Sequence, residues 1–363
     1  MRVTPLTFKK SFGFKLWRIH EQNVCSEHPL RQLFWECTLR CNLNCRHCGS
    51  DCKRESFIAD MPLDDFLKVL ESVAKRVHPQ NVFVIVSGGE PLMRKDIELC
   101  GIEIHKRGFR WGMVTNGYEL SPKRLCGLLN AGLSSLTLSV DGLENEHNWL
   151  RGNEMSFKKV DSAISFITNF HQITFDVVTC VNRQNYYQLK ELKEYLIKKN
   201  VKRWRIFTIF PVGRAAKNKE LILSDKEFRG VFDFIMKTRR ENLIKLNYGC
   251  EGFLGNYENE VRDHLFTCQA GITVGSVLAD GSISACTSIR SNLSQGNIYK
   301  DDFMDIWERR FLPFRNREWM KTGKCAKCYY FDYCGGNGMH LRDENGQLLL
   351  CHLEKLINAE SIK

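Results

Sequence analysis

The sequence predicts an α/β fold, a partial (β/α)6 barrel of the TIM type, followed by a cysteine-rich C-terminal domain. Two observations predict it. Short apolar runs rich in β-branched residues alternate with helical stretches between residues 33 and 210, and a dense group of cysteines follows in the last third of the chain. Such alternation favours a parallel sheet with helices on its outer face. About six βα units fall short of the eight that close a barrel.

Each predicted strand is a short apolar run that ends at a polar or glycine-containing turn. The helical stretches between them are longer and carry charged residues at intervals. Because turns that follow parallel strands gather at one edge of the sheet, we expect ligands to bind there. The predicted strands cover residues 33–35, 81–86, 111–115, 136–140, 174–181 and 203–210, and the predicted helices cover 63–76, 95–106, 122–131, 157–170 and 186–199.

The chain divides into four predicted segments. A basic N-terminal extension (1–31) precedes the barrel (32–225), and a bridging segment (226–265) leads to the cysteine-rich domain (266–363). In the extension, residues 8–19 mix aromatic and basic side chains, which suits either a packed arm or contact with a membrane surface. Gly13 weakens a continuous amphipathic helix, so we favour the packed arm.

Composition limits the class of protein. The chain has no run of 18 apolar residues and no apolar signal-peptide core, so we expect no transmembrane segment and a cytoplasmic location. At 363 residues without a signal, its 16 cysteines indicate metal or redox use more than disulfides. The net charge of +11 comes from scattered Lys and Arg, which indicates no nucleic-acid partner.

The most informative motif is Cys41-x3-Cys45-x2-Cys48, directly after the first predicted strand. Iron–sulfur clusters usually take four thiolates, so three closely spaced cysteines predict a four-iron cluster with one open iron. Zinc is the alternative, since a fourth ligand from Cys37 or Cys52 would complete a tetrahedral site.

The second motif, Ser87-Gly88-Gly89-Glu90-Pro91, follows the second predicted strand. Two glycines allow close backbone approach to a ligand, where free N–H and C=O groups can meet an amino group. Glu90 is expected to fix the loop, and Pro91 to stiffen it and start the next helix.

Together the two motifs resemble the radical SAM superfamily, over about residues 32 to 353. The resemblance implies that the open iron chelates S-adenosylmethionine and that one electron splits it into methionine and a 5′-deoxyadenosyl radical. It places His47 near the adenine, Ser139 and Asp141 near ribose or methionine, Arg151 on the methionine carboxylate and Asn116 in the pocket. The residues assigned to cofactor binding are His47, Gly88, Gly89, Glu90, Pro91, Asn116, Ser139, Asp141 and Arg151.

The C-terminal cysteines resemble the SPASM extension of these enzymes, which carries two auxiliary four-iron clusters. A hairpin with an Asp280-Gly281 turn is expected to support them over residues 277–284. The resemblance implies one cluster on Cys325, Cys328, Cys334 and Cys351. It implies a second on Cys268 and Cys286, with Cys250 as the candidate third ligand.

One position departs from the pattern of the family, because Gly338 stands where a cysteine of that second cluster is expected. We therefore expect this cluster to have an open or non-cysteine fourth site. The cofactors implied are a SAM-binding [4Fe–4S] cluster, S-adenosylmethionine and one or two auxiliary [4Fe–4S] clusters.

Enzymes with this extension mostly modify peptides or proteins, which predicts a peptide substrate that is cross-linked, oxidised or epimerised. Formylglycine formation is an alternative, weakened because Thr287 stands where that reaction expects an aspartate base. The sequences of residues 34–42 and 247–255 resemble those of a radical SAM/SPASM group found with small lipoproteins in Bacteroidetes. This resemblance implies a lipoprotein precursor as partner. A flavodoxin or ferredoxin is the expected electron donor. A redox carrier without catalysis and a zinc-stabilised adaptor remain the non-enzyme alternatives.

Overall fold

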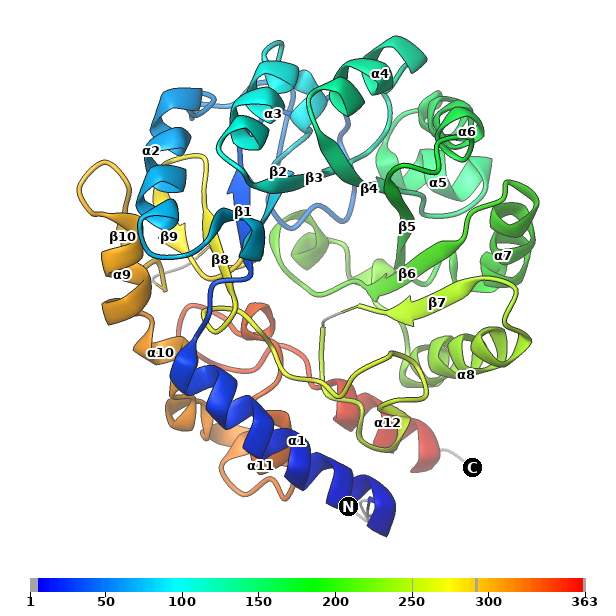
Figure 1. Ribbon diagram of the computed structural model, residues 1–363. Helices are drawn as coiled ribbons and strands as arrows, with labels where there is room; N and C mark the ends of the chain where they lie inside the picture. The colour runs from blue at the N-terminus through cyan, green and yellow to red at the C-terminus, as the bar shows by residue number, and fades with distance from the viewer. Residues whose placement is uncertain (1–5, 250, 291–292, 362–363) are drawn as a thin grey trace.

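The computed structural model describes residues 6–249, 251–290 and 293–361. Their strands form one ten-stranded sheet in the order β10-β9-β8-β1-β2-β3-β4-β5-β6-β7, parallel from β8 to β7 (Figure 1). The predicted α/β class and parallel sheet are confirmed. The strands are β1 (Gln32–Glu36), β2 (Phe83–Ser87), β3 (Arg110–Thr115), β4 (Leu133–Ser139), β5 (Thr174–Val181), β6 (Arg203–Thr208), β7 (Lys245–Tyr248), β8 (Val274–Val277), β9 (Ser282–Ser284) and β10 (Gly296–Asn297).

The sheet extends beyond the six predicted strands at both edges. At one edge β7 pairs with β6 in parallel, and at the other β8 pairs with β1 in parallel. An open sheet edge presents unpaired N–H and C=O groups, and these added strands satisfy them. The segments expected to bridge and to follow the barrel therefore continue its sheet. The predicted hairpin is confirmed, since β8 and β9 pair antiparallel and Gly281 takes φ +83° at the turn.

Helices surround the outer face of the curved sheet, as Figure 1 shows for α2 through α8. The five predicted helices agree with α2, α3, α4, α6 and α7 to within a few residues at each end, whereas α5 and α8 were not predicted. The helices are α1 (Phe8–Glu27), α2 (Leu63–Ala74), α3 (Ile97–Lys106), α4 (Pro122–Asn130), α5 (Glu144–Arg151), α6 (Ser156–Ile167), α7 (Leu189–Lys198), α8 (Asp225–Glu241), α9 (Phe303–Arg310), α10 (Leu312–Arg315), α11 (Phe331–Cys334) and α12 (His352–Ser361).

The N-terminal extension forms one long helix, α1, that packs on the C-terminal part of the chain. Its Phe14 ring lies 5.3 Å from that of Phe253 and 5.6 Å from that of Tyr333. The expectation of a packed arm is therefore right. Gly13 lies inside this continuous helix, where packing of the neighbouring Phe14 offsets the cost of about 1 kcal/mol for a helical glycine. Within the described residues, no helix is long and apolar enough to cross a membrane.

An aromatic stack fixes the first strand to the first helix of the barrel. The Trp35 ring of β1 lies parallel to that of Phe66 of α2 at 4.3 Å, and neither is exposed to solvent. Trp35 also donates from Nε1 to the sulfur of Met61 at 3.2 Å. Since β1 leads directly into the cysteine loop, this stack sets where that loop begins.

We expect Trp35→Ala to lower the free energy of unfolding by about 3–5 kcal/mol, because it leaves a cavity against Phe66. Chemical denaturation followed by circular dichroism measures this change. Trp319→Ala, at a site where the ring is 37% exposed, is the control and should cost clearly less. Equal losses in the two variants would contradict the anchoring role of Trp35.

Candidate functional site

Three cysteines and two glycines line one cavity at the carboxyl ends of β1 and β2. Cys41, Cys45 and Cys48 lie in the loop after β1, and Gly88 and Gly89 lie in the turn after β2. The parallel register of these neighbouring strands, with Glu36 beside Ser87, brings the two loops together. The predicted residues that line this cavity are His47, Gly88, Gly89, Glu90, Asn116, Ser139 and Arg151.

The glycines are required by close contact between the two loops. The amide of Gly89 donates to the carbonyl of Thr38 at 2.8 Å, and that of Glu90 donates to the carbonyl of Arg40 at 2.9 Å. A Cβ on Gly88 would collide with the Thr38 carbonyl, and one on Gly89 with the Arg40 carbonyl. Gly88 also takes φ +148°, which side chains rarely allow.

Glu90 holds the loop from beneath. Its carboxylate accepts hydrogen bonds from the Leu92 amide at 3.1 Å, the Thr115 hydroxyl at 2.6 Å and the Asn116 amide at 2.7 Å. This confirms that Glu90 fixes the loop. Its assignment to cofactor contact stays a prediction, and Glu90 also lines the cavity. Pro91 is buried outside the cavity and begins a short 3-10 turn, so it too acts by positioning.

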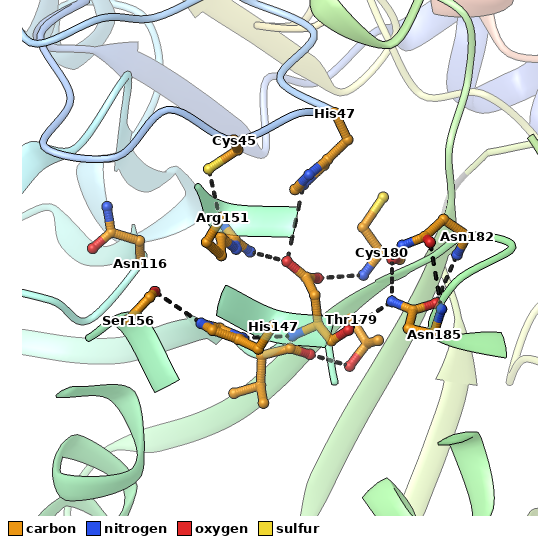
Figure 2. A network of polar contacts seen from close by, with 12 residues as sticks. Cys45, His47, Asn116, His147, Arg151, Ser156, Thr179, Cys180, Asn182 and Asn185 are labelled. Atoms are coloured by element: carbon orange, nitrogen blue, oxygen red, sulfur yellow. Dashed lines mark hydrogen bonds and ion pairs between the residues drawn. The ribbon is translucent and has the colours of Figure 1, made fainter. Parts of the chain in front are cut away.

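Arg151 connects the cysteine loop to a buried carboxylate. Its Nη2 lies 2.6 Å from Oδ2 of Asp141, and its Nη1 lies 3.7 Å from Sγ of Cys45. Asp141 pairs with Arg151 and is not among the residues that line the cavity, and its place near ribose or methionine stays a prediction. Figure 2 shows Arg151 beside Cys45, with His47 directed toward the same network.

The Asp141 carboxylate is held ionised inside the protein. Burial alone would raise its pKa, but the charge of Arg151 lowers the pKa overall, helped by the amide of Cys180, which donates at 2.8 Å. The backbone amide of Asp141 donates a hydrogen bond to Nδ1 of His147 at 3.1 Å. The other ring nitrogen of His147 lies 2.9 Å from the Ser156 hydroxyl. These contacts fix the ion pair and therefore the direction of Arg151.

His47 presents a neutral ring to the cavity. Burial lowers its pKa to about 4, against the raising effect of Asp141, whose Oδ2 lies 4.0 Å from Nε2. Within the described residues, buried polar atoms of His47 (Nδ1), Ser87 (Oγ) and Arg151 (Nε) have no hydrogen-bond partner. Three thiols beside unpaired donors and acceptors fit a cluster with a bound ligand that carries amino and carboxylate groups.

Arg214, which the sequence analysis missed, follows β6 and holds the cysteine loop by hydrogen bonds to its backbone carbonyls. Its Nε donates to the carbonyl of Cys45 at 2.7 Å, while Nη1 donates to that of Cys52 at 2.9 Å. Its backbone amide donates to the carbonyl of Cys48 at 2.9 Å. The only available signal was its place after a predicted strand.

The arrangement of thiols bears on the zinc alternative. Cys52 packs with Cys41 and Cys45, and its thiol hydrogen-bonds that of Cys48, whereas Cys37 lies apart and is fully buried. Among residues 6–249, 251–290 and 293–361, no three His, Cys, Asp or Glu side chains converge to hold a single metal ion.

Four C-terminal thiols, those of Cys325, Cys328, Cys334 and Cys351, stay the predicted ligands of one auxiliary cluster. Burial and the charges of Cys351, Cys325 and Cys328 raise the pKa of Cys334, and burial with the charges of Cys328 and Cys325 raises that of Cys351 to about 11. Arg342 donates from Nη2 to the sulfur of Cys325 at 3.4 Å.

At Gly338, where a cysteine is expected, the space for a side chain is occupied by the Glu251 carbonyl and the His340 ring. A Cβ at Gly338 would collide with the carbonyl of Glu251 and lie 2.8 Å from Cε1 of His340. Cys286 is near Cys268, whose charge adds to burial in raising the pKa of Cys286. Cys250 lies outside the described residues.

Comparisons with known proteins agree with this geometry. The Radical SAM superfamily matches residues 35–196, and the SPASM iron–sulfur cluster-binding domain matches residues 268–329. The chain carries a radical SAM domain and a SPASM domain. It is therefore a radical SAM enzyme, whose cofactors are a SAM-binding [4Fe–4S] cluster, S-adenosylmethionine and one or two auxiliary [4Fe–4S] clusters.

Three relatives define its neighbourhood. An AdoMet-dependent heme synthase of Nitratidesulfovibrio vulgaris is 26% identical, over 85% of this chain and 90% of its own. The mycofactocin maturase MftC of Mycolicibacterium smegmatis is 28% identical, over 85% and 77%. The crystal structure of Streptococcus suis SuiB bound to its precursor peptide SuiA aligns with a TM-score of 0.68 at 19% identity, covering 90% of this radical SAM enzyme and 76% of SuiB.

We expect Asp141→Asn to lower the free energy of unfolding by about 3–5 kcal/mol, because it leaves the Arg151 charge buried without a partner. Since the folded-state pKa of Asp141 is depressed, the stabilisation is present above the usual carboxylate pKa and is lost as the pH falls through the folded value. Urea unfolding at neutral pH measures it.

The control is Asp233→Asn, which breaks the exposed pair with Arg229 and should cost less than about 1 kcal/mol. A loss at Asp141 no larger than that at Asp233 would refute the buried pair as a structural support.

We expect Arg342→Gln to make the midpoint potential of the auxiliary cluster more negative, because a positive charge beside a ligating thiolate favours the reduced cluster. Redox titration followed by EPR measures the potential. Arg342→Lys should shift it less, and Arg309→Gln, at an exposed position, should leave it unchanged. An unchanged potential in Arg342→Gln at full iron content would contradict this role.

Proposed function

We propose that this radical SAM enzyme cleaves S-adenosylmethionine reductively and modifies a peptide or protein by hydrogen abstraction, giving a cross-link, an oxidised residue or an inverted stereocentre. The observation that carries the proposal is a second cavity of ≈ 500 Å³ that adjoins the first through Gly49 and Ser50. It lies between the cysteine loop and the C-terminal residues Met339 and His340. A substrate there would lie between the radical source and the SPASM domain.

The lining of this second cavity suits a peptide. It combines apolar side chains such as Phe210 and Ile289 with both basic and acidic groups. Its cations are already engaged, since Arg290 contacts Glu36 and donates to the Ser50 hydroxyl at 3.1 Å. Asp343 faces the same space, so an anionic substrate gains little from it. A mixed surface of this kind matches backbone amides and varied side chains.

The roles of the site residues belong to this proposal. We assign the SAM-binding cluster to Cys41, Cys45 and Cys48, and an auxiliary cluster to the four thiols around Cys325. The amino and carboxylate groups of S-adenosylmethionine would meet the open iron, the Gly88–Gly89 turn and Arg151, with His47 against the adenine. The other auxiliary site, with Cys268, Cys286 and Cys250, keeps three cysteines because Gly338 excludes a fourth. Mössbauer spectra that show only fully cysteine-ligated clusters would end this last assignment.

Two relatives support the choice of substrate class. The mycofactocin maturase MftC is the more identical of the two curated relatives described above, and SuiB was crystallised with a precursor peptide. A precursor of a small lipoprotein is the partner we favour, with a flavodoxin or ferredoxin as electron donor. We place the enzyme in the reducing cytoplasm, because thiolate ligands of iron–sulfur clusters suit a reducing compartment and no disulfide joins the 15 described cysteines.

A second candidate is a tetrapyrrole substrate. The match to an AdoMet-dependent heme synthase over 90% of its length favours it. The acidic residues in the second cavity, Asp343 and Glu344, oppose it, because porphyrin side chains carry carboxylates.

Anaerobic co-expression with small proteins encoded beside the gene tests the proposal. We expect one of them to lose two hydrogens by mass, or to keep its mass while one α-hydrogen is slowly exchanged for another, and Cys45→Ala should abolish the change. Turnover of an iron porphyrin, followed by its absorbance, with every peptide unchanged would favour the second candidate and contradict peptide modification.

A further inference from the structure

The outer face of α1 carries an apolar stripe that nothing in the described structure covers. It consists of Phe8, Phe12, Leu16 and Ile19, which are 89%, 57%, 54% and 57% exposed. Their spacing of four, four and three residues puts them on one side of the helix. Scattered exposed apolar residues are ordinary, but four aligned on one helix form a surface for an interaction.

The stripe has no part in holding α1 to the protein. The opposite face does that through Phe14 and Val24, which are 1% and 6% exposed, and through Trp17, whose indole donates to the Thr267 hydroxyl at 3.0 Å. Ser11 and Cys25 lie between the two faces, half-buried. The helix is therefore apolar on two sides, and only the inner side is used by the fold.

Positive charges accompany the stripe. Lys9 and Lys15 are exposed, and at about 100° per residue they fall on opposite flanks of the stripe. Residues 6–20 contain no Asp or Glu. The two other long cations of this stretch are engaged elsewhere, Lys10 with Glu260 and Arg18 with Asp332, both at 3.5 Å. The amino end of the helix dipole adds to the positive field.

We propose that α1 docks this radical SAM enzyme on the surface of an anionic lipid bilayer. Phe8, Phe12, Leu16 and Ile19 would enter the headgroup boundary, and the ammonium groups of Lys9 and Lys15 would reach lipid phosphates on either side. Figure 1 shows α1 as a long helix at the lower edge of the molecule, with α11 beside it.

Other occupants fit less well. A second copy paired through the same stripe would bring Lys9 and Lys15 against the lysines of its partner, and like charges in contact oppose association. A peptide usually binds a groove or a sheet edge, whereas the stripe is a ridge. This inference does not depend on the proposed function.

Sedimentation with vesicles of equal parts phosphatidylcholine and phosphatidylserine tests the proposal on the full-length reconstituted enzyme. We expect binding that weakens with salt and is much weaker on pure phosphatidylcholine. The pair Phe12→Ser with Leu16→Ser should lower the partition coefficient at least about tenfold. The pair Lys9→Gln with Lys15→Gln should lower it by roughly the same factor.

The matched control replaces two leucines of similar exposure elsewhere, Leu243→Ser with Leu312→Ser, at 65% and 64%. It should bind vesicles as the wild type does, and equal thermal midpoints show that all variants are folded. No vesicle binding, or binding that the stripe variants retain, would overturn the proposal. So would a dimer in lipid-free solution, or capture of a co-expressed precursor without lipid, that the stripe variants abolish.

Discussion

The contact between two neighbouring loops is the constraint on which the rest of the site depends. The cysteine loop after β1 and the Gly88–Gly89 turn after β2 touch through backbone alone, with amides of one donating to carbonyls of the other. Any side chain at either glycine would separate them. Because the strands beneath are parallel and in register, the three thiols and the turn open into one cavity. Glu90 then ties that turn to the end of β3.

Two buried arginines place positive charge beside the cysteine groups. The Arg151 guanidinium is held by Asp141 and points toward Cys45, so a positive charge lies beside a thiolate of the cluster loop. Arg342 stands in the same relation to Cys325 in the SPASM domain. Each cysteine group thus has a buried guanidinium within reach of one sulfur, and the second of these guanidiniums also borders the proposed substrate cavity. Arg342 therefore lies between a sulfur of the second cysteine group and the proposed substrate cavity.

Much of this could be predicted from the sequence, because the signals are local. The hydrophobic pattern and the turn residues predicted six strands, five helices and the hairpin. The spacing of the cysteines predicted both cysteine groups. What could not be predicted depends on distant contacts. The strands β7 and β8 are short and join the sheet only because its edges are free. Arg214 reaches the cysteine loop across about 170 residues of sequence, and the ion pair between Asp141 and Arg151 forms only where the fold brings β4 and α5 together.

The central claim is that Cys41, Cys45 and Cys48 hold the cluster that cleaves S-adenosylmethionine. The direct measurement is the 5′-deoxyadenosine formed by the anaerobically reconstituted enzyme with dithionite and S-adenosylmethionine. The account predicts clear product from the wild type and from Cys126→Ala, an exposed cysteine outside both groups, and none from Cys45→Ala. Product from Cys45→Ala at the level of the wild type, or none from the iron-loaded wild type, would contradict it.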